Sequence, residues 1–406
     1  FNFNKTNILM NSRRKFISKS SSLLTAGLVA PKFSSFSIFT KTPSMTVNLG
    51  IIGTGSRGMG LMKILNAIEN VTVTAICDTL SFRLTEAQEI CPKAKSFSSY
   101  KQLLEYKKLD GVIISTPLNT HATIASDAID ADLHIYCEKT MVKGQQATLD
   151  LVSKVAKEHN KIFQTGHQYH SSRLYSHVVE MIQGGKIGKI TAVNAQWNRN
   201  GDWRRPVPKM MYERQVNWRM YREFSYGLLA ELSSHQIDFV NWVTQLHPEK
   251  VAGFGGIDYW KDGRETYDNI HVIYSYPNGL KASFTCLTAN AKDDYKIRVF
   301  GDKGTIVLDY YKAWEYPEGA YTKEYGDVDG VSGATANWEP GKGIPIEYSH
   351  LDPTRQALED FRDAIVNEVP PISDITTGAK TAVAIDMGIR AMDQNKTVYW
   401  DKTINL

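Results

Sequence analysis

The stretch Val47-Asn48-Leu49-Gly50-Ile51-Ile52-Gly53-Thr54-Gly55-Ser56-Arg57-Gly58 decides the fold of this chain. Its first half is a largely apolar run, typical of a strand buried in a parallel sheet. Its second half has the spacing G-x-G-x-x-G and leads into helical spacing over residues 58–69. The next expected strand, Val71–Cys77, is followed by Asp78. A strand, a glycine turn, a helix and a strand ending in an acid predict a dinucleotide-binding unit.

Each glycine of this turn has a physical role. Gly53 permits the tight turn, Gly55 lets a pyrophosphate approach the backbone, and Gly58 lets the helix pack on the strand. The phosphates meet unpaired N–H groups at the helix N-terminus. Asp78 is placed to bind ribose hydroxyls and disfavours a 2′-phosphate, so NAD is expected rather than NADP, although Arg83 leaves NADP open. The alternative is a glycine turn of another α/β protein, with Asp78 as a helix cap.

Strand and helix continue to alternate up to Gly166. Strands are expected at Gly111–Ser115, His134–Cys137 and Lys161–Thr165, and helices at residues 101–106, 120–129 and 145–159. This alternation predicts an N-terminal Rossmann domain, a doubly wound parallel α/β sheet, over residues 46–166.

Beyond Gly166 the pattern changes. Helices are expected at residues 171–183, 227–243, 353–367 and 376–394, and strands at 189–197, 251–255, 269–276, 281–288, 296–301 and 305–309. Tight turns separate several of these strands, which indicates antiparallel pairing. Residues 315–350 are rich in Gly, Pro and Tyr and are expected to be a loop. Residues 167–406 are therefore predicted to form an α+β substrate-binding and oligomerisation domain on a large, mostly antiparallel open sheet. Its exposed face favours a homodimer or homotetramer.

Residues 1–45 differ from the rest in composition. Ser12-Arg13-Arg14-Lys15-Phe16-Ile17 precedes the short apolar run Leu23–Ala30, and a Ser/Thr/Pro-rich linker follows. A paired arginine before a mildly hydrophobic stretch is typical of a twin-arginine export signal, which predicts a periplasmic protein. The alternative is a basic tail with a chance Arg-Arg pair, which would leave the protein in the cytoplasm.

Composition excludes several classes of function. The chain has 406 residues, 42% hydrophobic and 22% charged, with a net charge of +4 and no Lys/Arg block, so no nucleic-acid partner is expected. No segment reaches the roughly 18 apolar residues of a transmembrane helix, so stable membrane insertion is not expected. The four cysteines lack C-x-x-C spacing, which argues against a disulfide framework or a zinc cluster.

Several motifs together resemble the Gfo/Idh/MocA family of sugar oxidoreductases from Val47 to the last helix. They are Gly53–Gly58, Asp78, Ser115-Thr116-Pro117 with His121, Glu138-Lys139-Thr140, Gly166-His167-Gln168, and Glu231–Asp238. The resemblance implies a Rossmann domain that holds NAD and a sheet domain that covers the nicotinamide and takes the substrate. It implies these cofactor-binding residues: Gly53, Thr54, Gly55, Ser56, Arg57, Gly58, Asp78, Thr116, Pro117, Asn119, His121, Glu138 and Lys139.

Two positions depart from the family pattern. The family usually has Pro after the Glu-Lys pair, where this chain has Thr140. A cis bond before Thr costs about 2.5–4 kcal/mol, so the lysine loop is expected to follow a different path. The family commonly has Asp four residues before the helix histidine, where this chain has the longer Glu231.

The chemistry implied by the resemblance needs a base and a cation near one substrate hydroxyl. Lys139 follows a buried strand at the carboxyl edge of the sheet and fits the cation, although spacing alone would favour an exposed lysine paired with Glu138. Glu231, His235 and Asp238 are spaced to share one helix face. His235 is the expected proton carrier, Glu231 is expected to contact substrate or raise its basicity, and Asp238 to orient its ring or reach substrate. A metal is not expected, because this face supplies only two ligands; a buried polar network is the remaining alternative.

Further candidates for substrate contact follow the Rossmann domain. His167 and Gln168 lie at the predicted domain junction and are placed to reach substrate hydroxyls, although a histidine there is as often structural. Arg199 and Trp203 belong to an aromatic, arginine-rich run from Trp197 to Arg205. Aromatic faces stack on sugar rings and Arg bonds several hydroxyls, but the same residues also suit a subunit interface.

These features predict an NAD-dependent oxidoreductase that moves a hydride from a sugar or glycoside hydroxyl, with C3 of a pyranoside as one candidate carbon. Export would place the enzyme away from a soluble NAD pool, so a tightly bound cofactor is expected. One alternative is redox-neutral glycoside hydrolysis or elimination through a transient 3-keto sugar. The other is a non-catalytic NAD or sugar sensor, against which the pair Lys139 and His235 argues.

Overall fold

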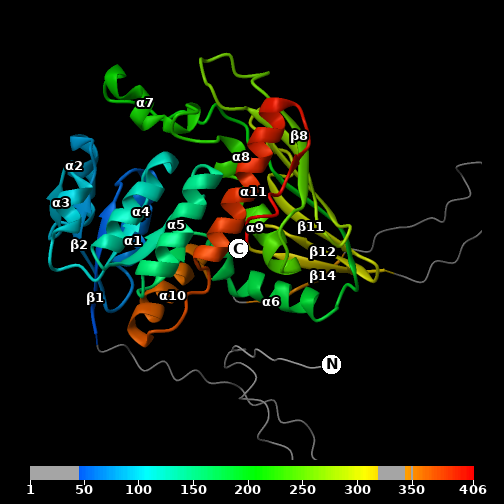
Figure 1. Ribbon diagram of the computed structural model, residues 1–406, viewed down its shortest axis with the longest axis horizontal. Coiled ribbons are helices and arrows are strands. Elements are labelled where there is room, and N and C mark those ends of the chain that lie inside the picture. The colour runs from blue at the N-terminus through cyan, green and yellow to red at the C-terminus, as the bar shows by residue number, and fades with distance from the viewer. Residues whose placement is uncertain (1–44, 319–342, 349–350) are drawn as a thin grey trace, which may run out of the picture. The chain divides into compact units, whose positions relative to one another are not determined.

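The computed structural model describes residues 45–318, 343–348 and 351–406. Residues 1–44, which carry the expected export signal, lie outside this part of the chain. Two sheets organise the described residues (Figure 1). Within those ranges, no helix has the length and apolar character needed to cross a membrane.

The first sheet has six parallel strands in the order β3-β2-β1-β4-β5-β6. They are β1 (Val47–Ile52), β2 (Val71–Cys77), β3 (Lys95–Phe97), β4 (Gly111–Ile114), β5 (His134–Cys137) and β6 (Phe163–Thr165). The helices between them are α1 (Ser56–Leu65), α2 (Ser81–Ile90), α3 (Tyr100–Leu104), α4 (His121–Asp130) and α5 (Gln145–Glu158). The expected doubly wound sheet is confirmed, and its strand order reverses between β1 and β4, where ligands bind in such sheets.

Two elements of this domain were not expected from the sequence. Strand β3 has three residues, none of them buried, and α2 buries only Ala87. Neither therefore has an apolar period long enough to be recognised.

Helix α10 (Pro353–Asn367) returns the chain to the first sheet. Its buried residues Leu358 and Phe361 share a hydrophobic core with Leu61, Ile113 and Tyr136, and the rings of Phe361 and Tyr136 lie 5.6 Å apart. The domain predicted over residues 167–406 includes this helix, because the prediction followed chain order. Its apolar face packs against the Rossmann sheet instead.

The second sheet has the order β14-β13-β12-β11-β7-β10-β9-β8-β15. Its strands are β7 (Ile190–Trp197), β8 (Lys250–Gly256), β9 (Asn269–Ser275), β10 (Lys281–Leu287), β11 (Tyr295–Gly301), β12 (Gly304–Leu308), β13 (Ala313–Pro317), β14 (Ile344–Pro345) and β15 (Val398–Tyr399). Pairing is antiparallel except between β7 and β10. The expected mostly antiparallel sheet is confirmed. The expected loop at 315–350 is wrong at its described ends, where β13 and β14 form.

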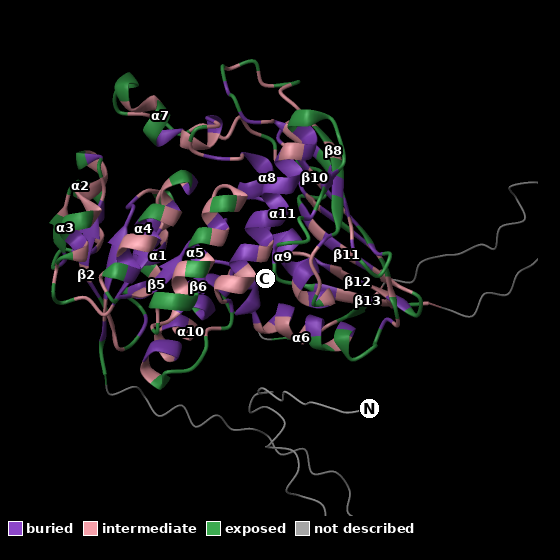
Figure 2. Ribbon diagram, viewed as in Figure 1, coloured by how far each residue is buried: buried purple, intermediate pink, exposed green. Residues whose placement is uncertain are grey.

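Helices cover one face of this sheet. They are α6 (Arg173–Gln183), α9 (Ser234–Thr244) and α11 (Ile375–Gln394), and they share one hydrophobic core with the inward residues of the strands. Figure 2 shows the buried residues gathered around α8, α9 and α11. The strands alternate between buried and exposed positions, and Phe254 and Ile273 on β8 and β9 are exposed.

The expected helix at 227–243 is interrupted. It consists of α8 (Leu228–Glu231) and α9, with Leu232 and Ser233 between them. Ser233 is fully buried, and its hydroxyl lies 3.1 Å from the Sγ of Cys286 on β10. The serine side chain is thus used in packing against the sheet and makes no cap hydrogen bond to α9.

Between β7 and α8 the chain forms few regular elements. They are α7 (Glu213–Val216) and short 3-10 turns at Met210–Tyr212 and Trp218–Met220.

Candidate active site

The glycine loop lies where β1 ends and α1 begins. Gly53 has a φ of +92°, and a Cβ at Gly58 would lie 2.1 Å from the carbonyl oxygen of Gly53. Only glycine allows this turn and this approach of α1 to β1. A Cβ at Gly55 would instead project to 3.4 Å from Nη1 of Arg83. Gly53 and Gly58 therefore close the turn, whereas Gly55 keeps the backbone open to the adjoining cavity.

Asp78 follows β2 and braces the same loop. Its Oδ2 accepts hydrogen bonds from the backbone N–H and the hydroxyl of Thr54, at 2.8 and 3.2 Å. Its Oδ1 accepts from the N–H of Leu80 at 2.9 Å. Thr54 is fully buried and holds Asp78 in place, and it is not among the residues that line the adjoining cavity.

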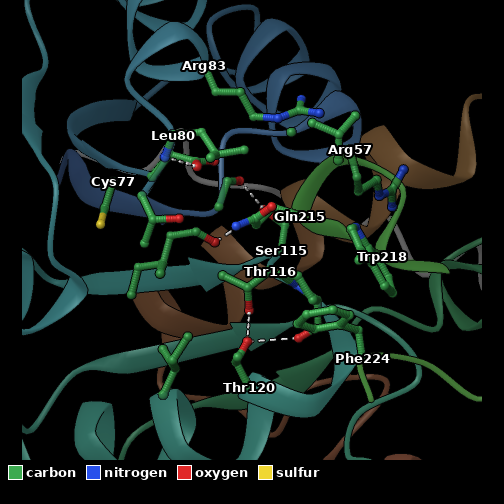
Figure 3. Close-up of a pocket in the computed structure, with 18 of the residues that line it drawn as sticks. Arg57, Cys77, Leu80, Arg83, Ser115, Thr116, Thr120, Gln215, Trp218 and Phe224 are labelled. Atoms are coloured by element: carbon green, nitrogen blue, oxygen red, sulfur yellow. Dashed lines mark hydrogen bonds between the residues drawn. The ribbon is translucent and has the colours of Figure 1, made fainter. Parts of the chain in front are cut away.

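A cavity of about 510 Å³ opens beside the loop and Asp78 (Figure 3). The expected cofactor-binding residues that line it are Gly53, Gly55, Ser56, Arg57, Asp78, Thr116, Pro117 and Asn119. It lies at the switch point of the parallel sheet, with a glycine turn at its wall and a carboxylate after the second strand. These features fit a dinucleotide.

The opposite wall comes from the second domain. Its residues are Arg205, Gln215, Val216, Trp218, Arg219 and Phe224. Sequence reasoning considered Trp197–Arg205 as a substrate surface or an interface and did not place it beside the cofactor. The only sequence signal was the unusual Trp and Arg content of this run. Its position beside the cavity depends on the path of the chain in three dimensions.

Glu138 and His121 lie behind the cavity wall instead of lining it. Glu138 Oε1 accepts a 2.6 Å hydrogen bond from Nε of Arg57, which does line the cavity. The ring nitrogens of His121 lie 2.9 Å from the carbonyl oxygen of Thr116 and 3.1 Å from that of Thr140. Burial lowers the pKa of His121. Both residues therefore position the wall through Arg57 and Thr116, and neither is among the residues that line the cavity.

Lys139 reaches from the Rossmann domain to the second domain. Its Nζ donates a 2.7 Å hydrogen bond to the backbone carbonyl oxygen of Glu231. Burial lowers the pKa of Lys139, opposed by the charges of Glu231 and Glu138. The Lys139–Thr140 peptide bond is cis, so the reason for expecting a different path of this loop does not apply.

The expected arrangement of Glu231 and Asp238 around His235 is not found. The carboxylate of Glu231 accepts hydrogen bonds from Arg219 at 3.0 Å and from Ser225 at 2.8 Å. Asp238 is buried and bonds His170 at 2.8 Å. The break between α8 and α9 separates Glu231 from the helix of His235, so the three side chains do not act as one face. The carboxylate of Asp238 positions His170 and has no hydrogen bond to His235.

His235 is buried beside His167. The two rings lie 6.1 Å apart and nearly perpendicular, at 83°. Nδ1 of His235, Nε2 of His167 and Oε1 of Gln168 are buried and have no hydrogen-bond partner among the described residues. Burial, together with the charge of Lys139, holds the pKa of His235 well below its usual value. Each buried polar atom without a partner needs an explanation, and these three atoms come from residues at the junction of the two domains.

Tryptophans and arginines extend this cluster. The rings of Trp197 and His235 are 6.0 Å apart. Arg199 lies 5.3 Å from the ring centroid of Trp197 and 6.0 Å from that of Trp203. Trp203 has a φ of +67°, which a bulky residue rarely adopts. The two expected substrate residues, Arg199 and Trp203, are thus brought together near His235.

Among the described residues, no group of three His, Cys, Asp or Glu side chains is arranged to hold a metal ion.

Two family models match this architecture. The NAD-binding Rossmann model of the oxidoreductase family matches residues 47–167, and the GFO/IDH/MocA C-terminal domain model matches residues 175–307. The chain belongs to the Gfo/Idh/MocA family of oxidoreductases. It therefore has the NAD-binding Rossmann domain and the sheet domain of an enzyme of that family.

Relatives within the family differ in what they do. The chain is 25% identical to myo-inositol 2-dehydrogenase of Thermotoga maritima over 85% of its own length and 93% of the relative. It is also 25% identical to 2,7-anhydro-N-acetylneuraminate hydratase of Escherichia coli over 75% and 83% of the two chains. The structure of levoglucosan dehydrogenase in complex with NADH matches with a TM-score of 0.71 and 17% identity, over 87% of this chain and 99% of that one.

Proposed function

We propose that this protein is an NAD-dependent dehydrogenase that oxidises a hydroxyl of a sugar or glycoside, with C3 of a pyranoside as the candidate carbon. The observation that carries the proposal is a group of buried side chains: Nδ1 of His235 and Nε2 of His167 have no hydrogen-bond partner among the described residues, and burial together with the charge of Lys139 lowers the pKa of both rings. Relatives that are inositol and anhydrosugar dehydrogenases support a carbohydrate hydroxyl as the substrate group.

The residues divide the chemistry between a base and a cation. His235 is neutral at neutral pH, because burial lowers its pKa, and it takes the hydroxyl proton as the carbonyl forms. The ammonium of Lys139 stabilises negative charge that develops on the same oxygen. When bound, the nicotinamide supplies the hydride acceptor. His167 and Gln168 hold neighbouring hydroxyls through their free polar atoms.

The substrate ring stacks beside the tryptophans in this proposal. Trp203 and Trp197 lie 6.0 and 5.3 Å from the guanidinium of Arg199, which we propose bonds the hydroxyls. Aromatic faces and Arg donors together suit a pyranose.

NAD is the proposed cofactor. Asp78 lines the cavity as a carboxylate after β2 and repels a 2′-phosphate. Arg83 lines the same cavity and is the residue through which NADP could still be accepted. Dissociation constants for NADH and NADPH, measured side by side, test this preference.

The deciding experiment uses protein purified without added cofactor. Its absorbance is followed while a panel of glycosides and free sugars is added. A lasting rise in NADH absorbance, with stoichiometric oxidised sugar, is the expected result. Absence of bound cofactor and of NAD binding would overturn the proposal and leave a sugar-binding sensor.

A second candidate is redox-neutral hydrolysis or elimination through a transient 3-keto sugar. One observation favours it: second-domain residues close the cavity wall, which suits a cofactor that is retained and restored in each turnover. One relative, from Escherichia coli, is named a hydratase and not a dehydrogenase. In the experiment above, an absorbance change that disappears as free sugar is released would support this candidate.

Export and assembly complete the proposal. We propose that the Arg13-Arg14 leader directs the protein to the periplasm and that the open face of the second sheet forms a homodimer or homotetramer. Arg13→Lys with Arg14→Lys should retain the protein in the cytoplasm. In analytical ultracentrifugation, the wild-type protein should sediment as a dimer or tetramer and Ile273→Asp as a monomer.

A further inference from the structure

Residues 204–224, here called the 204–224 segment, touch the Rossmann domain at two places. The ring of Tyr212 lies 5.7 Å from that of Phe82 on α2. The backbone carbonyl of Phe224 accepts a 3.1 Å hydrogen bond from the N–H of Asn119. Figure 3 shows Gln215, Trp218 and Phe224 facing the same cavity as Ser115 and Thr116. The segment therefore spans the cofactor cavity rather than bordering one side of it.

Ion pairs anchor this segment to the second domain. Arg204 pairs with Glu213 within the segment and, at 3.1 Å, with Asp262 outside it, which also pairs with Arg264 at 2.7 Å. Arg222 pairs with Asp393 at 2.8 Å. These anchors hold the segment in place without using Arg205.

Arg205 is instead fixed through its backbone. The side chain of buried Asn217 accepts from the Arg205 N–H at 2.6 Å and donates to the Arg205 carbonyl oxygen at 3.0 Å. Arg205 and Gln215 are both exposed residues that line the cavity, and neither side chain has a hydrogen-bond or ion-pair partner among the described residues.

Two of the other cavity arginines are already engaged, and the third, Arg83, belongs to the Rossmann side. Arg57 pairs with Glu138 at 2.6 Å, and Arg219 pairs with Glu231 at 3.0 Å. Arg205 therefore brings to the second-domain wall a positive charge that no described acid balances. A diphosphate carries two negative charges, and the glycine loop supplies N–H donors from the other wall only.

We propose that Arg205 and Gln215 form a second cofactor-binding element that contacts the diphosphate of the bound dinucleotide from the second-domain side. The inference rests on the proposed binding of NAD in this cavity. A guanidinium binds phosphate oxygens in bidentate fashion, and an amide adds a further donor. The dinucleotide is then enclosed between two domains and leaves only after the 204–224 segment moves.

The test compares ligands with and without the diphosphate. Arg205→Ala should weaken NADH and ADP by about tenfold or more, since it removes a charge-assisted bond, and should leave adenosine binding unchanged. NADH should also be released about tenfold faster in stopped-flow fluorescence, because affinity differences appear mostly in dissociation rates. Lys209→Ala is the matched control: it removes the same charge from the same segment at an exposed residue that does not line the cavity, and should change nothing.

A double-mutant cycle of Arg205 and Asn217 tests whether Asn217 positions Arg205. Asn217→Leu should reproduce the loss of ADP affinity, and the double variant with Arg205→Ala should lose little more than either single variant. Unchanged ADP binding by Arg205→Ala, or equal weakening of ADP and adenosine, would overturn the inference. Wild-type protein that binds neither NADH nor ADP would overturn the proposed function as well.

Discussion

Nζ of Lys139 donates a 2.7 Å hydrogen bond to the backbone carbonyl oxygen of Glu231, so a side chain of the Rossmann domain is held by the main chain of the second domain. One residue later, the hydroxyl of Thr140 donates to the carbonyl oxygen of Ala230 at 2.9 Å. A carbonyl acceptor fixes the ammonium without neutralising it. The position of Lys139 therefore depends on where α8 ends.

Replacing Lys139 should separate chemistry from binding. Lys139→Met should lower the rate of NADH formation by about 10²–10⁴-fold, the range for a group that assists proton or charge transfer. Affinity for NADH should stay close to that of wild type, because Lys139 does not line the cofactor cavity. Single-turnover absorbance and NADH titration measure the two effects. Lys143→Met, four residues further along the chain, is the control. Full activity of Lys139→Met would show that Lys139 takes no part in the mechanism.

The pH profile should report the low pKa of His235. A base must be neutral to accept a proton, and burial keeps the pKa of His235 well below its ordinary value of about 6.5. The maximal rate should therefore stay level as pH falls through 6.5 and decline only in more acid solution. His235→Gln should lower the rate by about 10²–10⁴-fold and remove this acid limb. An acid limb centred near pH 6.5 would contradict the burial of His235.

Stability should fall in acid for the same physical reason. Burial lowers the pKa of His121, His167 and His235 in the folded protein. Below about pH 6.5 the unfolded chain binds protons that the folded chain does not, so the free energy of unfolding decreases as pH drops. Thermal melting at a series of pH values should show this decline, and His235→Gln should flatten it. An equal slope in the variant would mean that His235 does not contribute.

Gly166→Ala should disturb the pair of Glu138 and Arg57. A Cβ at Gly166 would lie 2.8 Å from Oε2 and 2.9 Å from Cα of Glu138. We expect a loss of about 1–3 kcal/mol in unfolding free energy, as for other overpacked sites, with weaker NADH binding. Gly60→Ala is the control, because a Cβ there meets nothing within 4 Å and helix α1 favours alanine. Denaturant unfolding of both variants makes the comparison, and equal stability would contradict the predicted clash.

Trp203→Ala should act on substrate affinity. Trp203 lies near Arg199 and Arg219, at 6.0 and 5.9 Å from their guanidinium carbons, and is proposed to stack on the substrate ring. Loss of a stacking face worth about 1–1.5 kcal/mol should raise KM by about tenfold with little change in kcat. Trp203→Phe should recover part of the affinity. A change in kcat alone would place Trp203 outside the substrate site.

Local pattern was enough to predict the Rossmann sheet. Val47–Ile52, the glycine spacing and Asp78 lie within one continuous stretch, and each feature reports a backbone requirement of its own position. The antiparallel second sheet was also predictable, because its strands alternate between buried and exposed residues. Strand β3, helix α2 and the break at Ser233 were missed, since short or weakly amphipathic elements acquire their structure from neighbours distant in sequence.

The sequence by itself determined the dinucleotide loop, the doubly wound sheet and the kinds of side chain available for chemistry. Only the tertiary structure decided which of them meet. It joined Asp238 to His170 instead of His235, turned Glu231 toward Arg219, and brought Arg205 to the cofactor cavity. The physical reason is that periodicity and spacing act within a few residues, whereas these contacts join segments whose proximity depends on how helices and sheets pack.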